Sequence, residues 1–142
     1  MSFDAETADN LEDIEKQFAV KAVMQAETYF SLLEKIPGSK LKLTQHDDDI
    51  YEQFLEAFPE YRTPESVAEI NEEDMKSKSG KERWRAFCEK FNEIEDYNFG
   101  TLLRTKASSE YDQEGTIFVV RIQFYAIEIA RNRAGLNDWI KK

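Results

Sequence analysis

The sequence predicts a mainly helical α+β fold with about five helices and one β-hairpin before the C-terminal helix. Apolar residues recur at helical spacing along most of the chain, whereas residues 99–105 and 116–120 are rich in Thr, Val, Leu and aromatic residues. With 142 residues, of which 41% are hydrophobic, the chain can bury one core. We therefore predict a single domain over residues 1–142, with a flexible N-terminus at 1–9 and a short C-terminal tail at 136–142.

The first predicted element is a helix of about 26 residues, long enough to span the domain. Asp9 or Asn10 can cap its N-terminus, and Pro37-Gly38 ends it. Between these signals, apolar side chains at helical spacing form one stripe: Leu11, Ile14, Phe18, Ala22, Ala26, Tyr29, Leu33 and Ile36.

Three shorter helical segments are expected next. Thr44 and Asp47 form a start that resembles a capping box, and Pro59 ends the helix that follows. Thr63-Pro64-Glu65 places a proline after an N-cap residue, which indicates a short helix. Residues 71–74 can start one more helical turn. The apolar stripe of the first of these helices is Ile50, Phe54, Leu55 and Phe58.

The clearest amphipathic helix is predicted to begin at Ser79, because Ser79 and Glu82 have the spacing of a capping box. Its apolar side chains follow at helical spacing: Trp84, Phe87, Cys88, Phe91 and Ile94.

The β-hairpin comes next, with strands at 99–105 and 116–120 joined by a long loop. The chain is then expected to enter its last helix near Val120 or Arg121 and to leave it near Asn132. Gly135 supplies the stop signal. Trp139 is the residue expected to fasten the tail.

The net charge of −10 is unevenly distributed along the chain. Residues 45–74 hold eleven acids and one base, and residues 1–15 hold six acids and no base. Such acidic stretches disfavour binding to nucleic acid or anionic membranes and favour a basic protein partner. The alternative is that the charge only keeps the domain soluble, and residue chemistry alone favours neither interpretation.

Several features favour an intracellular location. No apolar run approaches the ~20 residues that cross a bilayer. The polar, acidic residues 1–10 do not resemble a signal peptide. A single cysteine, Cys88, allows no internal disulfide. We expect the protein in the cytoplasm, with the nucleus as a second location.

No catalytic, cofactor or metal site is expected. His46 followed by Asp47, Asp48 and Asp49 invites a metal hypothesis, but acids in the first turn of a helix are explained by its dipole. Cys88 lies on an apolar helix face, far in sequence from the single histidine, so a Cys–His pair is not expected. The five glycines are isolated from one another, which excludes a phosphate-binding glycine loop.

The most informative stretch is the apolar segment 121–133, because it carries several charged residues. Charges in or near a core need partners. Residues 95–104 are the expected partner stretch, with Glu95, Asp96 and Glu128 available to pair with arginines. The resulting polar network is either structural or a surface that contacts a partner. The candidate partner-binding residues are Asp47, Asp48, Asp49, Tyr97, Phe99, Arg104, Arg121, Glu128, Arg131, Asn132 and Arg133.

These stretches also carry a family resemblance. The segments 41–44, 48–51, 76–77, 81–85, 95–104 and 121–133 resemble the small eukaryotic "polysaccharide biosynthesis domain-containing" family. The opening residues 1–20 and the ending Leu136-Asn-Asp-Trp-Ile140 are similar to its fungal members. The resemblance covers nearly the whole chain in order. Some animal members carry a long Lys/Glu-rich C-terminal extension, whose role does not carry over to this sequence.

The resemblance implies a role in protein folding. The fungal members are dedicated chaperones of translation elongation factor 1-alpha, and they bind its nascent GTP-binding domain. The implied protein is a monomeric, ATP-independent chaperone without enzymatic activity or cofactors. Its expected partners are that domain and ribosome–nascent-chain complexes, without direct contact to nucleic acid or membranes. The main alternative is a non-catalytic cytosolic adaptor. A third hypothesis, an enzyme of polysaccharide synthesis, is supported by the family label alone.

Overall fold

A computed structural model describes residues 5–112 and 114–142, with side chains from Val20 onward. The described part contains six α-helices and two strands. They are α1 (Ala5–Lys35), α2 (Asp47–Ala57), α3 (Pro64–Ala68), α4 (Glu72–Lys76), α5 (Lys78–Glu89), β1 (Gly100–Arg104), β2 (Thr116–Val120) and α6 (Arg121–Arg133), with short 3-10 turns η1 (Gly38–Lys40), η2 (Pro59–Arg62) and η3 (Asp138–Ile140). The predicted class is confirmed: the fold is mainly helical, with one antiparallel hairpin directly before the last helix.

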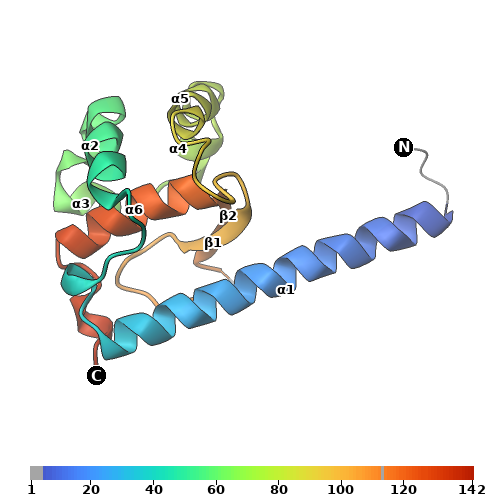
Figure 1. The fold of residues 1–142 in the computed structure, drawn as a ribbon, viewed down its shortest axis with the longest axis horizontal. Coiled ribbons are helices and arrows are strands. Elements are labelled where there is room, and N and C mark those ends of the chain that lie inside the picture. The colour runs from blue at the N-terminus through green and yellow to red at the C-terminus, as the bar shows by residue number, and fades with distance from the viewer. Residues whose placement is uncertain (1–4, 113) are drawn as a thin grey trace.

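Helix α6 is the central element of the domain. It packs against α2, α3, α5, η1 and both strands. Figure 1 shows α2 to α5 on one side of α6 and the long helix α1 on the other, with the hairpin between α1 and α6. Helix α1 extends well beyond the rest of the domain at its N-terminal end (Figure 1). Its C-terminal half contacts β1 and the C-terminal turn η3.

The hairpin faces the core with alternate residues, as a half-buried antiparallel pair requires. Leu103 pairs with Ile117, and Thr101 pairs with Val119. All four side chains are buried. On the other face Leu102 lies opposite Phe118, whose side chain is 56% exposed. This alternation places Phe118 on the outside of the hairpin.

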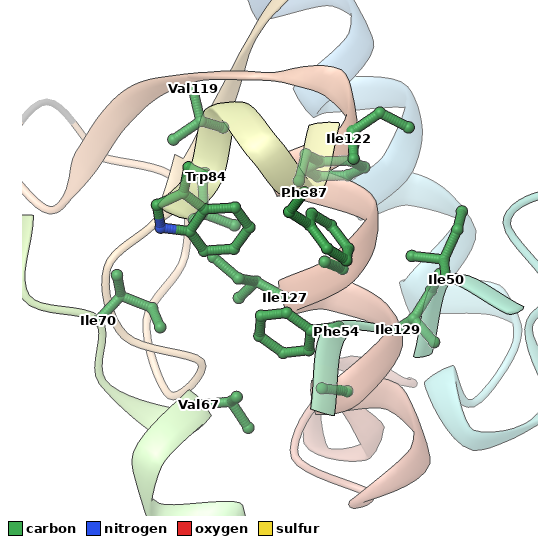
Figure 2. Packing of buried hydrophobic residues seen from close by; sticks show 14 of the residues in the cluster. Ile50, Phe54, Val67, Ile70, Trp84, Phe87, Val119, Ile122, Ile127 and Ile129 are labelled. Atoms are coloured by element: carbon green, nitrogen blue, oxygen red, sulfur yellow. The ribbon is translucent and has the colours of Figure 1, made fainter. Parts of the chain in front are cut away.

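The core joins α6 to the short helices through apolar and aromatic side chains. In Figure 2, Phe54 of α2, Trp84 and Phe87 of α5 and Ile127 of α6 converge on one point. The rings of Phe54 and Phe87 meet edge to face, with centroids 6.0 Å apart. Most of the predicted stripes of α2 and α5 is confirmed as core, since Ile50, Phe54, Phe58, Trp84, Phe87, Cys88 and Phe91 are buried. Leu55 and Ile94, the other two predicted members, are only partly buried and pack against this core.

Three helix starts differ from the prediction. Helix α1 begins at Ala5, before the predicted caps Asp9 and Asn10, while residues 1–4 lie outside the described part. Helix α5 is capped by Ser77, whose Oγ accepts a hydrogen bond from the Gly80 amide at 3.0 Å. Ser79, the predicted N-cap, lies inside the helix. Ser77 is the N-cap because the preceding helix α4 ends at Lys76 and leaves Ser77 in an extended conformation.

The third start is that of α2: the predicted pair Thr44 and Asp47 is hydrogen-bonded, but His46 occupies the N-cap position and the helix begins at Asp47. The Asp47 carboxylate accepts hydrogen bonds from the amide of Leu43 at 2.8 Å and from the amide and hydroxyl of Thr44 at 2.7 and 2.8 Å. The carboxylate therefore organises the turn that leads into the helix. Asp47 is buried by this arrangement, at 6% exposure.

The C-terminal residues after α6 are more firmly anchored than a tail. Gly135 ends the helix with a φ of 75°, as predicted, because glycine adopts the left-handed conformation freely. Asn137 and Ile140 are buried and anchor the turn η3. Trp139 donates its indole N–H to the carbonyl of Ala107 at 2.9 Å, although its side chain stays 49% exposed.

Candidate functional site

The charged residues that the sequence singled out divide into a buried group and a surface group. At the centre of the buried group is Glu128 of α6, which has no solvent exposure. Its Oε1 accepts a hydrogen bond from Arg104 at 2.8 Å, and its Oε2 accepts one from Arg131 at 3.4 Å. Both arginines are also fully buried. One carboxylate is thus shared by two guanidinium groups inside the domain.

Arg104 is stabilised by partners from three segments of the chain. Besides Glu128, its guanidinium donates to the carbonyls of Ala107 and Ser109 at 3.0 and 2.9 Å and to Asn137 Oδ1 at 2.7 Å. The carbonyls belong to the loop after β1, and Asn137 belongs to the C-terminal turn. Only the Nε of Arg104 is left without a hydrogen-bond partner. This bonding offsets most of the desolvation of a buried cation.

Arg131 links α6 to α3 and to the start of the hairpin loop. Its Nε donates to the carbonyl of Val67 at 2.7 Å, and a terminal nitrogen donates to the carbonyl of Thr105 at 3.2 Å. Next to it, Asn132 donates to the Tyr29 hydroxyl at 3.2 Å and accepts from Asn137 at 2.7 Å. The network therefore connects α1, α3, α6, the hairpin loop and the C-terminal turn.

The electrostatics of this network keep Glu128 ionised. Burial alone would raise the pKa of Glu128, but the positive charges of Arg131 and Arg104 outweigh burial and hold the pKa below its ordinary value. Burial and the negative charge of Glu128 in turn raise the pKa of the Tyr29 hydroxyl, which stays protonated. The two arginines leave one excess positive charge, which the backbone carbonyls of the loop and α3 partly compensate.

Four predicted partner-binding residues belong to this network. Arg104, Glu128 and Arg131 have no exposure and Asn132 has 2%. Side chains at this depth cannot touch a folded partner, and their hydrogen bonds are used within the domain. Of the two hypotheses drawn from the sequence, the structural one describes these four residues. Any contact surface must lie among the exposed residues.

Arg121 was expected to pair with an acid, but it has a different partner. It donates to the amide oxygen of Gln25 at 2.8 Å, and its guanidinium lies 5.8 Å from the ring centroid of Phe99. Glu95 and Asp96 are exposed. Gln25 is 96 positions away in sequence and comes from α1. Of the three acids that the sequence offered to Arg104 and Arg121, Glu128 pairs with Arg104, whereas Arg121 bonds to an amide of α1 instead. Tyr97 and Phe99 are partly buried beside it.

The acids at the start of α2 have separate roles. Asp47 is buried as described, whereas Asp48 pairs with Arg133 of α6 and Asp49 is exposed. Arg133 also stacks its guanidinium 4.7 Å from the Tyr51 ring centroid. Because Asp47 and Asp48 turn to different partners, they do not converge on one point as metal ligands must. Within the described residues, no cluster of three or more His, Cys, Asp or Glu is arranged to hold a metal ion.

The other candidate for chemistry, Cys88, is a packing residue. Its side chain is buried on α5, and burial raises the pKa of its thiol to about 11. The thiol is therefore protonated at neutral pH and is a poor nucleophile. His46 is exposed at the start of α2.

The structure also shows an exposed apolar surface that the sequence prediction missed. Helix α1 exposes Val20, Val23 and Met24 to 57%, 44% and 60%, and the outer face of the hairpin exposes Phe118. Leu102 connects them, because it lies opposite Phe118 and lines a groove together with Val23. We call these five residues the α1–hairpin face. The signal in the sequence was that residues 20, 23 and 24 are apolar although they lie off the predicted core stripe of the first helix.

No described helix combines the length and the apolar composition that a membrane span requires.

Comparison with known proteins places the chain among close relatives. The sequence profile of the family described as "PBDC1 protein" matches residues 14–142. "Protein PBDC1 homolog" of Saccharomyces cerevisiae is 67% identical over 140 residues, which cover 98% of this chain and 96% of that protein. The Schizosaccharomyces pombe homolog is 58% identical over 140 residues, covering 98% of this chain and 95% of that protein.

More distant and structural relatives agree with this placement. Human "Protein PBDC1" is 48% identical over 138 residues, which cover 96% of this chain and 58% of the human protein. A solution NMR structure of a Saccharomyces cerevisiae protein matches with a TM-score of 0.86 and 68% identity, covering 97% of this chain and 95% of that one.

Proposed function

This chain belongs to the PBDC1 family, and from that membership we propose that it is a dedicated, ATP-independent chaperone of translation elongation factor 1-alpha. In this proposal it binds the GTP-binding domain of the factor while that domain is newly made and only partly folded. It acts in the cytoplasm, without enzymatic activity and without a cofactor. The identity of the client comes from the family resemblance, while the surface of the molecule supports the mode of action.

The α1–hairpin face is the observation that supports a holding function. Single exposed apolar side chains are common on soluble proteins, but a contiguous group of them marks an interaction surface. Here Val20, Val23 and Met24 lie on adjacent turns of one helix, and Phe118 extends the group across the hairpin. Such a surface can cover apolar side chains that a folding client has not yet buried.

The mechanism requires only equilibrium binding. A folding GTPase domain exposes apolar sheet surface and an empty nucleotide site before native packing is complete. A protein that binds this form lowers the concentration of free, aggregation-prone chains. It releases the client when native packing buries the same apolar side chains. The acidic charge of the chaperone favours encounter with a basic client.

The test is the fate of newly made elongation factor in cells that lack this protein. Pulse-labelled elongation factor 1-alpha is expected to aggregate or to be degraded, while the pre-existing pool stays folded. Re-expression of the chain should restore the soluble yield. A different newly made GTPase serves as the control for specificity, and its yield is expected to stay unchanged.

A purified system separates this function from the adaptor alternative. The chain should suppress aggregation of the denatured, diluted GTP-binding domain to the same extent with and without ATP. If pulse-labelled elongation factor has the same solubility and yield in both cell types, the chaperone proposal is wrong. Co-purification of a mixed set of cytosolic proteins, instead of one dominant GTPase, would then indicate an adaptor.

A further inference from the structure

We propose that the client is held as an extended segment in the groove between α1 and the hairpin, with an apolar side chain in the groove and Lys or Arg on either side of it. This inference rests on the proposed chaperone function and assigns that function to one surface. It names the chemistry of the client segment, which the family resemblance does not supply.

The groove has mainly apolar walls. It has a volume of about 400 Å³, within the range of pockets that accept ligands. Val23 and Ala26 of α1 form one wall, and Leu102 and Thr116 of the hairpin form the other. The exposed Val20, Met24 and Phe118 extend the apolar surface beyond the groove. A segment lying in it would therefore remove contiguous apolar area from water.

Tyr111 lines the groove and is held by the buried network. Its ring lies 5.6 Å from the guanidinium carbon of Arg104 and meets the Phe30 ring edge to face at 6.1 Å. Arg104 is itself fixed by Glu128 and Asn137. The groove wall is thus preorganised, which lowers the entropic cost of binding.

Charge complementarity indicates the residues that flank the apolar side chain. Two acids, Glu27 and the exposed Asp112, line the groove, and the Asp112 carboxylate also accepts a hydrogen bond from the amide of Gly115. Three bases close in sequence to the groove are engaged elsewhere. Arg104 is buried behind Tyr111 and bonded to Glu128. The Lys21 ammonium lies 5.9 Å from the Phe99 ring centroid, and Lys106 lies 4.0 Å from Glu69. An apolar groove with an acidic rim fits an apolar side chain between basic residues and disfavours an acidic segment.

The first experiment uses overlapping peptides that span the GTP-binding domain of elongation factor 1-alpha. The full chain is expected to bind those peptides in which Lys or Arg flanks a large apolar residue. Val23→Lys should weaken this binding about tenfold or more, because it places a cation in the groove. Glu27→Lys should weaken it too and reduce its dependence on salt.

Leu32→Lys is the matched control, since Leu32 is a 40% exposed apolar residue of the same helix and does not line the groove. Leu32→Lys adds one positive charge, as Val23→Lys does, and should leave peptide binding within about twofold of the wild-type value. Circular dichroism and urea unfolding of all variants check that each one is folded.

The second experiment separates failure of the groove from failure of the function. Wild type, Val23→Lys and Leu32→Lys are compared in the aggregation assay with the denatured GTP-binding domain. Protection by wild type and Leu32→Lys, but not by Val23→Lys, supports the proposal. Equal protection by all three proteins would show that the groove is not the binding site, although the chaperone function would stand. No protection by wild type means that the function itself fails. A wild-type dimer that Val23→Lys converts to a monomer in light scattering would show that a second copy covers the groove, which also overturns the proposal.

Discussion

Glu128 is the residue on which the interior of this protein depends. It carries a negative charge at zero exposure, and its neighbours Arg104 and Arg131 are equally buried. Replacing such a group as a whole with apolar residues can be neutral, but removing one member leaves an unpaired buried charge. The network therefore makes Glu128, Arg104 and Arg131 interdependent.

At the residue scale, Glu128→Ala should lower the free energy of unfolding by about 3–5 kcal/mol, because it leaves two buried arginines without their carboxylate. Arg121→Ala is the comparison. Arg121 is only partly buried and donates to neutral Gln25, so its loss should cost only about 1 kcal/mol. Urea unfolding at neutral pH measures both. Equal effects of the two substitutions would show that Glu128 is not a buried ion-pair partner.

The same network predicts a pH dependence of stability. The pKa of Glu128 is held below its ordinary value in the folded protein by Arg131 and Arg104, against the opposing effect of burial. The ionised group therefore stabilises the fold above the unfolded-state pKa of about 4.3, and this contribution is lost as the pH falls through the lower folded pKa. The difference in unfolding free energy between wild type and Glu128→Gln should shrink as the solution is acidified from pH 6. A difference that stays constant down to acid unfolding would contradict this assignment.

At the element scale, the helix starts show how neighbouring segments select a cap. Ser77 and Ser79 are both chemically suited to cap α5, but α4 ends directly before Ser77. Its Oγ accepts from Gly80 and its hydroxyl donates to the carbonyl of Asp74 at 2.8 Å. The α4–α5 junction is thus one connected turn, and the choice of cap depends on both helices.

Ser77→Ala is therefore expected to lower stability by about 1 kcal/mol, while Ser79→Ala should change it by less than about 0.5 kcal/mol. The two substitutions remove the same hydroxyl two positions apart, so each is the control for the other. Thermal or urea unfolding gives the comparison. A larger loss of stability for Ser79→Ala than for Ser77→Ala would show that Ser79 is the N-cap, as the sequence pattern suggested.

At the scale of the whole molecule, the acidic charge of residues 45–74 is mostly at the surface. Asp47 is buried and Asp48 is paired with Arg133, but Asp49, Glu52 and Glu56 are exposed on α2. Exposed charge of one sign steers an oppositely charged partner, and salt screens this effect. Neutralising Asp47 would be a poor test of steering, because it would also remove the hydrogen bonds that organise the start of α2.

We expect neutralisation of Asp49, Glu52 and Glu56 to slow association with the client domain severalfold at low salt and to have little effect at high salt. Stopped-flow association rates over a range of ionic strength are the measurement. Neutralising the exposed acids Glu89, Glu93 and Glu95 is the control for an equal change in net charge. If both triple variants slow association equally, only net charge matters and α2 has no special role.

The sequence by itself determined the fold class, most element positions and the family. Helical spacing, the Thr63-Pro64 start, the alternating strands and Gly135 are local signals, and local geometry alone decides what they mean. The sequence also indicated that the charges in 121–133 need partners. Glu128 and Arg131 lie one helical turn apart, so their contact could be predicted from helical spacing alone.

Only the tertiary structure decided which long-range partners meet. Arg104 reaches Glu128 and Asn137, whereas Arg121 reaches Gln25 across 96 positions instead of the nearby acids. It also decided that Arg104, Glu128, Arg131 and Asn132 are internal and that Val23 and Phe118 are external. The physical reason is that helical spacing fixes which residues share a face, but the crossing of α1, α6 and the hairpin determines whether that face meets another element or water.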